Sequence, residues 1–258
     1  MVERRSAIRA AVVWDTLRRV LEARQDAVRA GGADRPLEVV DLGGGTGGLA
    51  VQIAELGHHV LVVDPSPDAL ASLERRAAEA DIGTAVRGVL GDAAGLLDVV
   101  AAGSADVVVC HGVLEVVDVP AQAVQAAASA LSSGGALSLL AAQRSGAVFA
   151  RAVSGHVTEA RTLLADPDGR WGPTDPMPRR FTGDQLADLL GAAGLTVAEV
   201  RGVRVFTDHL SSAGIEAERF EHGADEAAEA WLALEAEVAT NPDFLAIATQ
   251  LHLLATKP

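Results

Sequence analysis

Residues 37–48 have the sequence LEVVDLGGGTGG, in which a short apolar run ends in a row of glycines. An unbroken apolar run of this length is typical of a strand that is buried on both faces of a parallel sheet. Glycines let the backbone approach a ligand closely, and the helix expected over residues 49–56 presents free amides at its N-terminus. The stretch therefore predicts a strand, a ligand-binding turn and a helix.

The same alternation continues along the chain. We expect further strands at residues 59–64, 85–90, 105–110, 136–142, 195–206 and 252–256, helices at residues 65–80, 93–101, 120–131, 182–192 and 224–238, and a turn at residues 132–135. Apolar strands that alternate with helices predict a mostly parallel sheet covered on both faces. The sequence thus predicts an α/β protein with a doubly wound, mostly parallel, seven-stranded sheet.

Two segments stand outside this alternation. Apolar residues recur at helical spacing within residues 1–32, which predicts a leading helix. Residues 143–181 predict an irregular insertion or lid, in which a helix at residues 145–164 is followed by a stretch rich in Pro, Gly and Asp. We expect all of these parts to form a single domain over residues 1–258.

Composition and charge limit the classes of function. The chain has 258 residues and a formal net charge of -14, which opposes non-specific binding to a nucleic-acid backbone, although basic residues are concentrated in residues 144–204. No apolar run approaches the roughly 18 residues that cross a bilayer, and no signal peptide is evident. We therefore expect a cytoplasmic protein that is not inserted in a membrane. The single cysteine, Cys110, cannot form an internal disulfide.

The glycine loop and two acids predict the kind of ligand. In a doubly wound sheet, ligands bind beyond the carboxyl ends of the strands. Asp64 ends the second strand, where a carboxylate can accept both ribose hydroxyls of an adenosine. Gly43, Gly45 and Gly48 also satisfy the dinucleotide pattern GxGxxG, so the loop alone leaves a nicotinamide cofactor open. Asp41, just before the glycines, suits a cationic ammonium and would repel a pyrophosphate.

Several motifs resemble known families. Residues 41–45 and residues 90–93 resemble the class I S-adenosylmethionine-dependent methyltransferases. Similarity to the bacterial tRNA 5-carboxymethoxyuridine methyltransferases is found at residues 8–14, 111–115, 202–206, 234–235 and 252–258. The resemblance spans essentially the whole chain. It implies an S-adenosylmethionine cofactor, tRNA as a partner, and methylation of the carboxylate of a modified uridine at the wobble position.

The resemblance also implies a set of cofactor contacts. Together with the loop residues singled out above, the expected cofactor-binding residues are Arg9, Asp41, Gly43, Gly44, Gly45, Asp64, Asp92, Ala93, Ala94 and His111. Arg9 would bind the methionine carboxylate of the cofactor, because a guanidinium matches a carboxylate bidentately. Asp92 follows the third strand, where it is placed for adenine recognition.

The expected catalytic residues are Arg204 and His111. Methyl transfer to a carboxylate needs no general base, because the acceptor is already ionised near neutral pH. Arg204 would orient the acceptor carboxylate; the alternative is that it pairs with a nearby acid. His111 would face the cofactor or the substrate; the alternative is a hydrogen-bonded loop histidine. His111 and Glu115 are too few for a metal site, and we expect no metal.

Two other functions remain open at this stage. The chain has no tyrosine and few aromatic residues, which leaves few platforms for stacking a base and suits a small-molecule O-methyltransferase acting on a metabolite acid. A cofactor-binding protein without catalysis, with an acidic C-terminal face for a protein partner, is the other alternative. Phe149, Trp171 and Phe181 would line a substrate cleft or seal it. The sequence predicts no oligomeric state.

Overall fold

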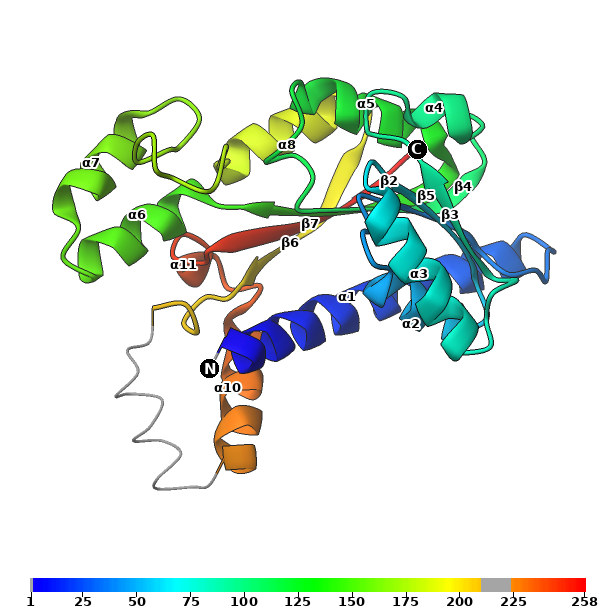
Figure 1. The fold of residues 1–258 in the computed structure, drawn as a ribbon, viewed down its shortest axis with the longest axis horizontal. Coiled ribbons are helices and arrows are strands. Elements are labelled where there is room, and N and C mark those ends of the chain that lie inside the picture. The colour runs from blue at the N-terminus through cyan, green and yellow to red at the C-terminus, as the bar shows by residue number, and fades with distance from the viewer. Residues whose placement is uncertain (1, 210–223) are drawn as a thin grey trace. The chain divides into compact units, whose positions relative to one another are not determined.

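The structure is a computed structural model that describes residues 2–209 and 224–258 (Figure 1). The chain divides into two compact units. Unit 1 comprises Met1–Thr16, Ala141–Gln185 and Glu199–His252, and unit 2 comprises Leu17–Leu140, Leu186–Ala198 and Leu253–Pro258. The expectation of a single domain stays a prediction. No helix among the described residues is both long and apolar enough to cross a bilayer.

A seven-stranded sheet with the strand order β3-β2-β1-β4-β5-β7-β6 confirms the predicted fold class. The strands are β1 Glu38–Leu42, β2 His59–Asp64, β3 Val86–Leu90, β4 Ala105–His111, β5 Leu131–Ala142, β6 Thr196–Val203 and β7 Gln250–Thr256. β1 pairs in parallel with β2 and β4, β2 with β3, and β4 with β5. One pair in the sheet is antiparallel. Strand order reverses direction at β1, so the fold is a doubly wound α/β fold.

Helices cover both faces of the parallel strands in unit 2. They are the C-terminal part of α1 Val2–Ala30, α2 Gly48–Glu55, α3 Pro67–Glu79, α4 Leu96–Val99 and α5 Pro120–Ala130. α2 and α3 lie together on one face, whereas α4 and α5 lie together on the other (Figure 1). α3 begins at Ser66, whose hydroxyl accepts a hydrogen bond from the Ala69 amide at 3.2 Å, with Pro67 as its first residue.

The remaining helices carry residues of unit 1. They are α6 Arg144–Val153, α7 Val157–Ala165, α8 Gly183–Ala192, which continues into unit 2, α10 Ala224–Val238 and α11 Pro242–Leu245. The single helix expected at residues 145–164 is wrong, because Gly155 adopts a left-handed conformation with φ of 81° and separates α6 from α7. At the start of α8, Thr182 Oγ1 accepts from the Gln185 amide at 3.2 Å, and Gln185 Oε1 accepts from the Thr182 amide at 2.9 Å.

Two further elements differ from the sequence-based expectation. The helix expected at residues 93–101 is reduced to α4, because Asp92 Oδ1 accepts hydrogen bonds from the amides of Ala94 and Gly95 and holds a turn there. The turn expected at residues 132–135 is part of β5. There the Gly134 amide donates to Lys257 O, and the Lys257 amide donates to Gly135 O, both at 2.9 Å. A pairing partner more than 100 residues away therefore extends this strand.

The core of unit 2 is the parallel sheet itself. Aliphatic residues of its strands are fully or almost fully buried, including Leu42, Val62, Val63, Val107, Val108, Leu137 and Leu139. Because strands of this kind are covered on both faces, their apolar runs are continuous rather than alternating. This core holds the carboxyl ends of β1 to β4 in fixed register at one rim of the sheet.

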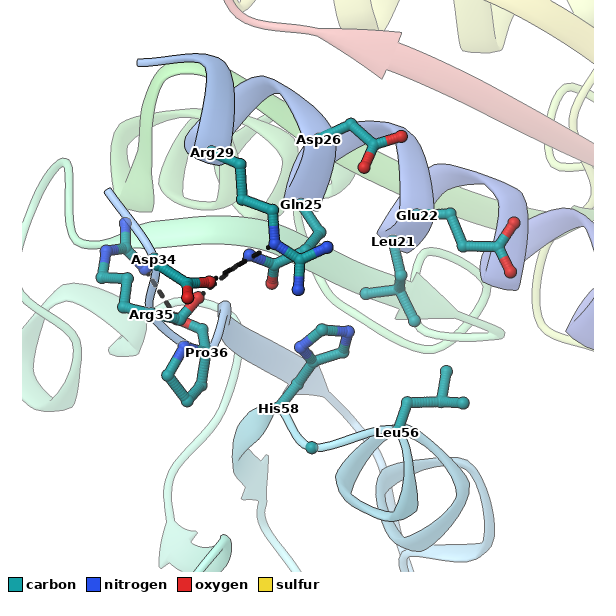
Figure 2. Close-up of a pocket in the computed structure, with 11 residues that line it drawn as sticks. Leu21, Glu22, Gln25, Asp26, Arg29, Asp34, Arg35, Pro36, Leu56 and His58 are labelled. Carbon is teal, nitrogen blue, oxygen red and sulfur yellow. Dashed lines mark hydrogen bonds and ion pairs between the residues drawn. The ribbon is translucent and has the colours of Figure 1, made fainter. Parts of the chain in front are cut away.

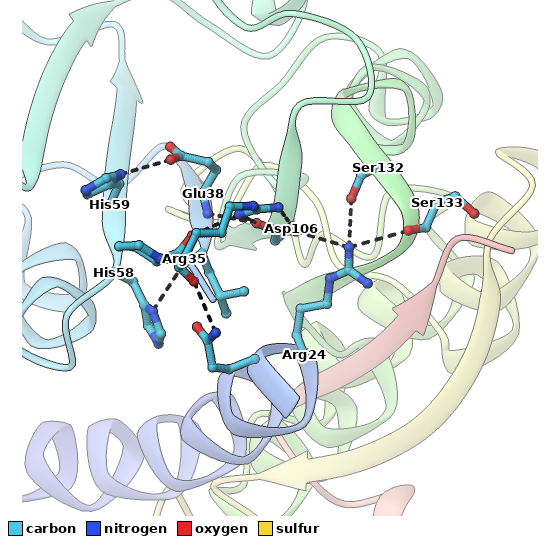
Figure 3. A network of polar contacts seen from close by, with 11 residues as sticks. Arg24, Arg35, Glu38, His58, His59, Asp106, Ser132 and Ser133 are labelled. Atoms are coloured by element: carbon cyan, nitrogen blue, oxygen red, sulfur yellow. Dashed lines mark hydrogen bonds and ion pairs between the residues drawn. The ribbon is translucent and has the colours of Figure 1, made fainter. Parts of the chain in front are cut away.

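The amino ends of the same strands are held by a charged network (Figure 3). Asp106 of β4 is 1% exposed, and its two oxygens accept four hydrogen bonds. Arg35 donates two of them, at 2.6 and 3.1 Å, Arg24 donates one at 3.1 Å, and the Glu38 amide donates one at 3.0 Å. Burial alone would raise the pKa of Asp106, but these hydrogen bonds outweigh it and lower that pKa.

Candidate active site

The predicted ligand loop lies at the carboxyl end of β1, as expected. Asp41 is in register with Val62 of β2 and Val109 of β4, so the loop that follows lies at the point where the strand order reverses. Gly43 adopts φ of 70° and Gly45 φ of 58°, which side chains disfavour. The Gly43 amide donates to Val63 O at 2.8 Å and ties the loop to β2.

Gly44 leaves room for the carboxylate of Asp41. A β-carbon at Gly44 would collide with that carboxylate and would press against Val62, while one at Gly43 would collide with Val113. The loop is therefore packed from below by its own strand and by the segment that follows β4. Close packing therefore requires glycine at residues 43 and 44, and a positive φ favours it at residues 43 and 45.

Asp41 is a buried carboxylate without a matching cation in unit 2. It is 3% exposed, and its Oδ2 accepts no hydrogen bond from the described residues. Burial, reinforced by the nearby charge of Asp64, raises the pKa of Asp41 to about 7. A buried carboxylate in this state favours a positively charged ligand group, such as the ammonium that the sequence predicted.

Asp64 ends β2 and helps to shape the loop. Its Oδ2 accepts from the Gly45 amide at 2.8 Å, and its Oδ1 accepts from the Ser66 amide at 2.9 Å. A carboxylate has about four acceptor positions, so each oxygen retains one for a ligand hydroxyl. Asp64 therefore orders the loop and keeps the capacity to accept two hydroxyl groups.

The third expected cofactor segment follows β3. Asp92 and Ala94 are exposed, Ala93 is buried, and Asp92 Oδ1 accepts from the Ala94 and Gly95 amides, each at 2.9 Å. Because β3 pairs in parallel with β2, the Asp92 segment and Asp64 extend from adjacent strand ends. The structure thus brings Asp41, Asp64 and Asp92 to one rim of the sheet in unit 2.

His111 is the last residue of β4 and lies at the same rim. Its Nε2 is 2.8 Å from Ser138 Oγ, and Ser138 of β5 is completely buried. The hydroxyl fixes the ring orientation, which is the hydrogen-bonded arrangement considered as the alternative for this residue. A ring held in this way can also present its other face to a ligand, so a cofactor or substrate contact stays a prediction.

A cavity at the opposite rim of unit 2 was not predicted. It has a volume of about 590 Å³ and opens among the residues that precede β1 and β2, including Arg29, Asp34 and His58 (Figure 2). Arg29 pairs with Asp34, and the Leu37 amide donates to His58 Nδ1 at 3.4 Å. Burial is the main cause that lowers the pKa of His58. Arg29 and Asp34 therefore already pair with each other, and His58 already accepts a hydrogen bond from the backbone.

Unit 1 contains a cavity of about 370 Å³ with a basic lining. Arg151, Arg180 and Arg204 line it together with Trp171, Asp208 and Thr249. The guanidinium carbon of Arg151 lies 3.6 Å from the centroid of the Trp171 ring, and that of Arg180 lies 4.5 Å from it. Sequence reasoning singled out Arg204 and Trp171 but missed Arg151, Asp208 and Thr249, which come from separate segments.

The sequence predicted that Arg204 lies on the sixth strand. In the structure β6 ends at Val203, so Arg204 lies just past it. Its backbone adopts a left-handed conformation with φ of 60°, and its guanidinium pairs with Asp208. Thr249 Oγ1 donates to Asp208 at 2.7 Å. Arg204 therefore has the acidic neighbour considered as the alternative and also lines the cavity.

Glu235 of α10 explains the turn at Arg204. This buried carboxylate accepts from the Val205 amide at 2.8 Å and from the Phe206 and Thr207 amides at 2.9 Å. Three amides that converge on one carboxylate hold the turn that follows Arg204 and keep residues 205–207 in place. The sequence showed Glu235 only as part of a family motif, and its acceptor role is visible only in three dimensions.

Several arginines of the insertion, including Arg180 of the cavity lining, bond to neighbouring residues of the same segment. Arg180 donates two hydrogen bonds to the buried carboxylate of Asp175, at 2.7 and 3.0 Å, Arg179 pairs with Asp168, and Arg144 donates to the Pro167 carbonyl. These contacts close the irregular stretch upon itself. The basic residues of the insertion therefore form internal ties more than a continuous basic stripe.

The remaining expected residues have the following positions. Trp171 lines the cavity, Phe181 is buried, and Phe149 packs edge-on against His209 with ring centroids 4.8 Å apart. Arg9 falls within α1, but its side chain lies outside the described residues.

Among the residues that the structure describes, no group of three His, Cys, Asp or Glu side chains could hold a metal ion. Cys110 is buried, which is the first of the causes that raise the pKa of its thiol.

Comparison with known proteins gives the class of protein. A model of the methyltransferase domain matches residues 40–137, which include the glycine loop, Asp64, Asp92 and His111. The crystal structure of the cyclase SpnF has the same fold, with a TM-score of 0.57 and 20% identity over 93% of this chain and 80% of that one. The chain belongs to the class I S-adenosylmethionine-dependent methyltransferases, and its cofactor is S-adenosylmethionine.

Two curated relatives indicate where the chain falls within that class. The tRNA 5-carboxymethoxyuridine methyltransferase of Escherichia coli O157:H7 is 30% identical over 255 residues, which is 97% of this chain and 88% of that protein. The ubiquinone biosynthesis O-methyltransferase of Burkholderia thailandensis is 30% identical over 165 residues, which is 64% of this chain and 67% of that protein. The similarity to the tRNA enzyme thus extends through both units.

Proposed function

We propose that the protein transfers a methyl group to a carboxylate oxygen of 5-carboxymethoxyuridine at the wobble position of tRNA. The observation that carries the proposal is the cavity of unit 1, whose lining contains Arg151, Arg180 and Arg204 and suits an anionic acceptor. The similarity to the tRNA enzyme over 97% of the chain supports the same acceptor. Modification of tRNA is consistent with a cytoplasmic protein.

Unit 2 would bind the cofactor, which supplies the methyl group. In this proposal Asp41 binds the ammonium of the methionine part, because its buried carboxylate has no cationic partner within unit 2. The family resemblance assigns the methionine carboxylate to Arg9, which belongs to unit 1 and whose side chain lies outside the described residues. Asp64 accepts the ribose hydroxyls, and the glycines of residues 43–45 allow the close approach. The segment of Asp92, Ala93 and Ala94, together with His111, contacts the adenine end or the reacting end of the cofactor.

Arg204 would orient the acceptor carboxylate in unit 1. The acceptor is ionised at neutral pH, so its oxygen needs orientation and partial removal of water rather than a base. A guanidinium binds both oxygens of a carboxylate and fixes its plane. Asp208 pairs with Arg204, so in this proposal the substrate carboxylate would compete with Asp208 for the guanidinium.

Arg204→Leu tests this role. We expect turnover to fall by about 100-fold or more, because a bond between two charged groups is lost, while the affinity for S-adenosylmethionine changes less than twofold. Steady-state methylation and calorimetry measure the two quantities. Arg201→Leu is the matched control, since Arg201 pairs with Glu199 at 2.6 Å and does not line the cavity. Unchanged turnover in Arg204→Leu would remove Arg204 from the site.

The acceptor itself is tested with labelled cofactor. The protein is incubated with total tRNA from a strain that lacks the endogenous methyltransferase, with tRNA that lacks 5-carboxymethoxyuridine, and with a panel of small carboxylic acids. Label should enter only the first tRNA.

A small-molecule O-methyltransferase is the second candidate, supported by the similarity to the ubiquinone enzyme over 64% of the chain. Label in the small acids alone would favour it, and no label in any acceptor would favour a protein that binds the cofactor without catalysis.

A further inference from the structure

The lining of the unit 1 cavity draws on residues from both ends of α6. Ala147, Ala150 and Ser154 line it, and residues three or four positions apart share one face of a helix. Ala142, just before α6, and His156, just after it, line the same cavity. Because a ten-residue helix is about 15 Å long, the two ends of the cavity are well separated.

Arg204 belongs to the end of the cavity at which α6 begins. The Thr249 amide donates to Arg204 O at 3.4 Å, and the Gln143 amide donates to Thr249 O at 2.9 Å. Gln143 immediately precedes α6, so these two bonds link the backbone of Arg204 to the first turn of that helix. The proposed carboxylate-binding group therefore occupies one end of the cavity.

A second cluster of donors lies at the other end, where α6 stops. Arg151 is in the last turn of α6, and Ser154 and His156 follow it. Trp171 packs against the guanidinium of Arg151, and Glu159 pairs with its Nη1 at 3.1 Å. Stacking engages the face of a guanidinium and leaves its edges to donate, so Arg151 is held in place and keeps donors for a ligand.

The charge of the lining favours an anion at this second end. Each of the three cavity arginines has an acidic partner, namely Glu159, Asp175 and Asp208, but of these only Asp208 lines the cavity. Asp208 pairs with Arg204, at the first end. The second end thus presents Arg151, a hydroxyl and an imidazole, a combination of donors that binds phosphate oxygens well.

We propose that Arg151, Ser154 and His156 form a phosphate-binding subsite, which receives the phosphate of a nucleotide whose base carries the carboxylate bound by Arg204. This proposal rests on the proposed function and extends it. The subsite selects nucleotides over small carboxylic acids, because a small acid has no second anionic group to place there. Trp171 is a positioning residue in this arrangement, since it orients Arg151.

Kinetics with two acceptors test the subsite. The acceptors are 5-carboxymethoxyuridine and its 5′-monophosphate, and the variants are Arg151→Gln and the control Arg161→Gln. Arg161 is exposed on α7 and does not line the cavity, so its replacement removes the same charge from the same segment. We expect Arg151→Gln to raise KM for the monophosphate about tenfold and to leave KM for the nucleoside within twofold. Arg161→Gln should change neither.

Calorimetry gives a readout that does not depend on methyl transfer. Uridine 5′-monophosphate should bind the wild type about tenfold more tightly than uridine does, and Arg151→Gln should abolish that difference. If neither carboxymethoxy compound is methylated but this difference is found, the proposed function fails and the subsite stands. Equal binding of uridine and its monophosphate, or equal effects of the two arginine substitutions, would overturn the subsite.

Discussion

Two buried aspartates on neighbouring strands of unit 2 have opposite surroundings. Asp106, at the amino end of β4, is 1% exposed and accepts four hydrogen bonds, from Arg24, Arg35 and the Glu38 amide. Asp41, at the carboxyl end of β1, is 3% exposed and has an oxygen that accepts none from the described residues. Their pKa values shift in opposite directions, downward for Asp106 and upward to about 7 for Asp41.

The difference is between a carboxylate that has partners within the chain and one that the proposed function assigns to a ligand. A buried charge that lacks partners costs stability, so such a carboxyl either takes up a proton or gains a partner from a ligand. Asp106 stabilises the amino ends of the sheet by itself. In the proposed function, the ammonium of the cofactor would supply the partner that the Asp41 carboxylate lacks among the described residues.

Asp41→Asn should produce the largest effect. The affinity for S-adenosylmethionine should fall about 100-fold, because the ammonium loses a charged partner. The same variant should raise the free energy of unfolding at pH 8 by about 1 to 2 kcal/mol, because a buried unpaired charge is removed. Calorimetry and urea denaturation measure the two changes.

Asp34→Asn is the control for this variant. Asp34 is an acid at the opposite rim, and its side chain is 90% exposed. Its replacement should alter neither quantity. Wild-type affinity in Asp41→Asn would refute the assignment of the ammonium to Asp41.

Asp106→Asn should show the opposite pattern, a loss of stability with little change in cofactor affinity. The free energy of unfolding should fall by about 2 kcal/mol, because Arg24 and Arg35 lose their shared charged acceptor. The loss is moderate because Arg35 is partly exposed, so water can replace some of its lost hydrogen bonds. Cofactor affinity of the folded variant should stay within twofold of the wild type. A loss of affinity at full stability would mean that the network acts on the loop, and the contrast with Asp41 would fail.

The pH dependence should give the smallest effect. The pKa of Asp41 in the folded protein, about 7, lies above the value of about 3.9 in an unfolded chain. The preference of the folded protein for protonated Asp41 therefore contributes fully to stability below pH 4, and this contribution is lost as pH rises through 7. Cofactor binding should follow the opposite trend, about tenfold weaker at pH 6 than at pH 8, because Asp41 must release a proton to bind the ammonium. Calorimetry in buffers of different ionisation enthalpy should detect the released proton. Asp41→Asn should abolish both the pH dependence of cofactor binding and the proton release.

The sequence predicted the parallel strands because their signal is local. Runs such as residues 59–64 and 105–110 are apolar throughout, and turn residues separate them from helices. It predicted neither the early start of β5 nor the short α4. The first depends on Lys257, far away in the chain, and the second on a side chain, that of Asp92, that replaces helical hydrogen bonds. The break at Gly155 did have a local signal, the pair Ser154-Gly155.

The two candidate sites differ in the same way. Asp41 is next to last in a predicted strand, Asp64 ends one and Asp92 follows one, so parallel pairing alone brings them to one rim. The cavity of unit 1 draws on α6, the irregular stretch near Trp171, the turn after β6 and the start of β7. No spacing in the sequence relates these segments, and Arg151 and Asp208 were therefore missed.

The place of β7 in the strand order affects how the chain folds during synthesis. β7 separates β5 from β6, yet it is synthesised after both. β6 therefore leaves the ribosome without its neighbour in the sheet, and its edge stays open until translation has passed residue 256. Sheets completed by such distant pairing form slowly and expose strand edges to aggregation. Slower translation between β6 and β7 should therefore lower the soluble yield.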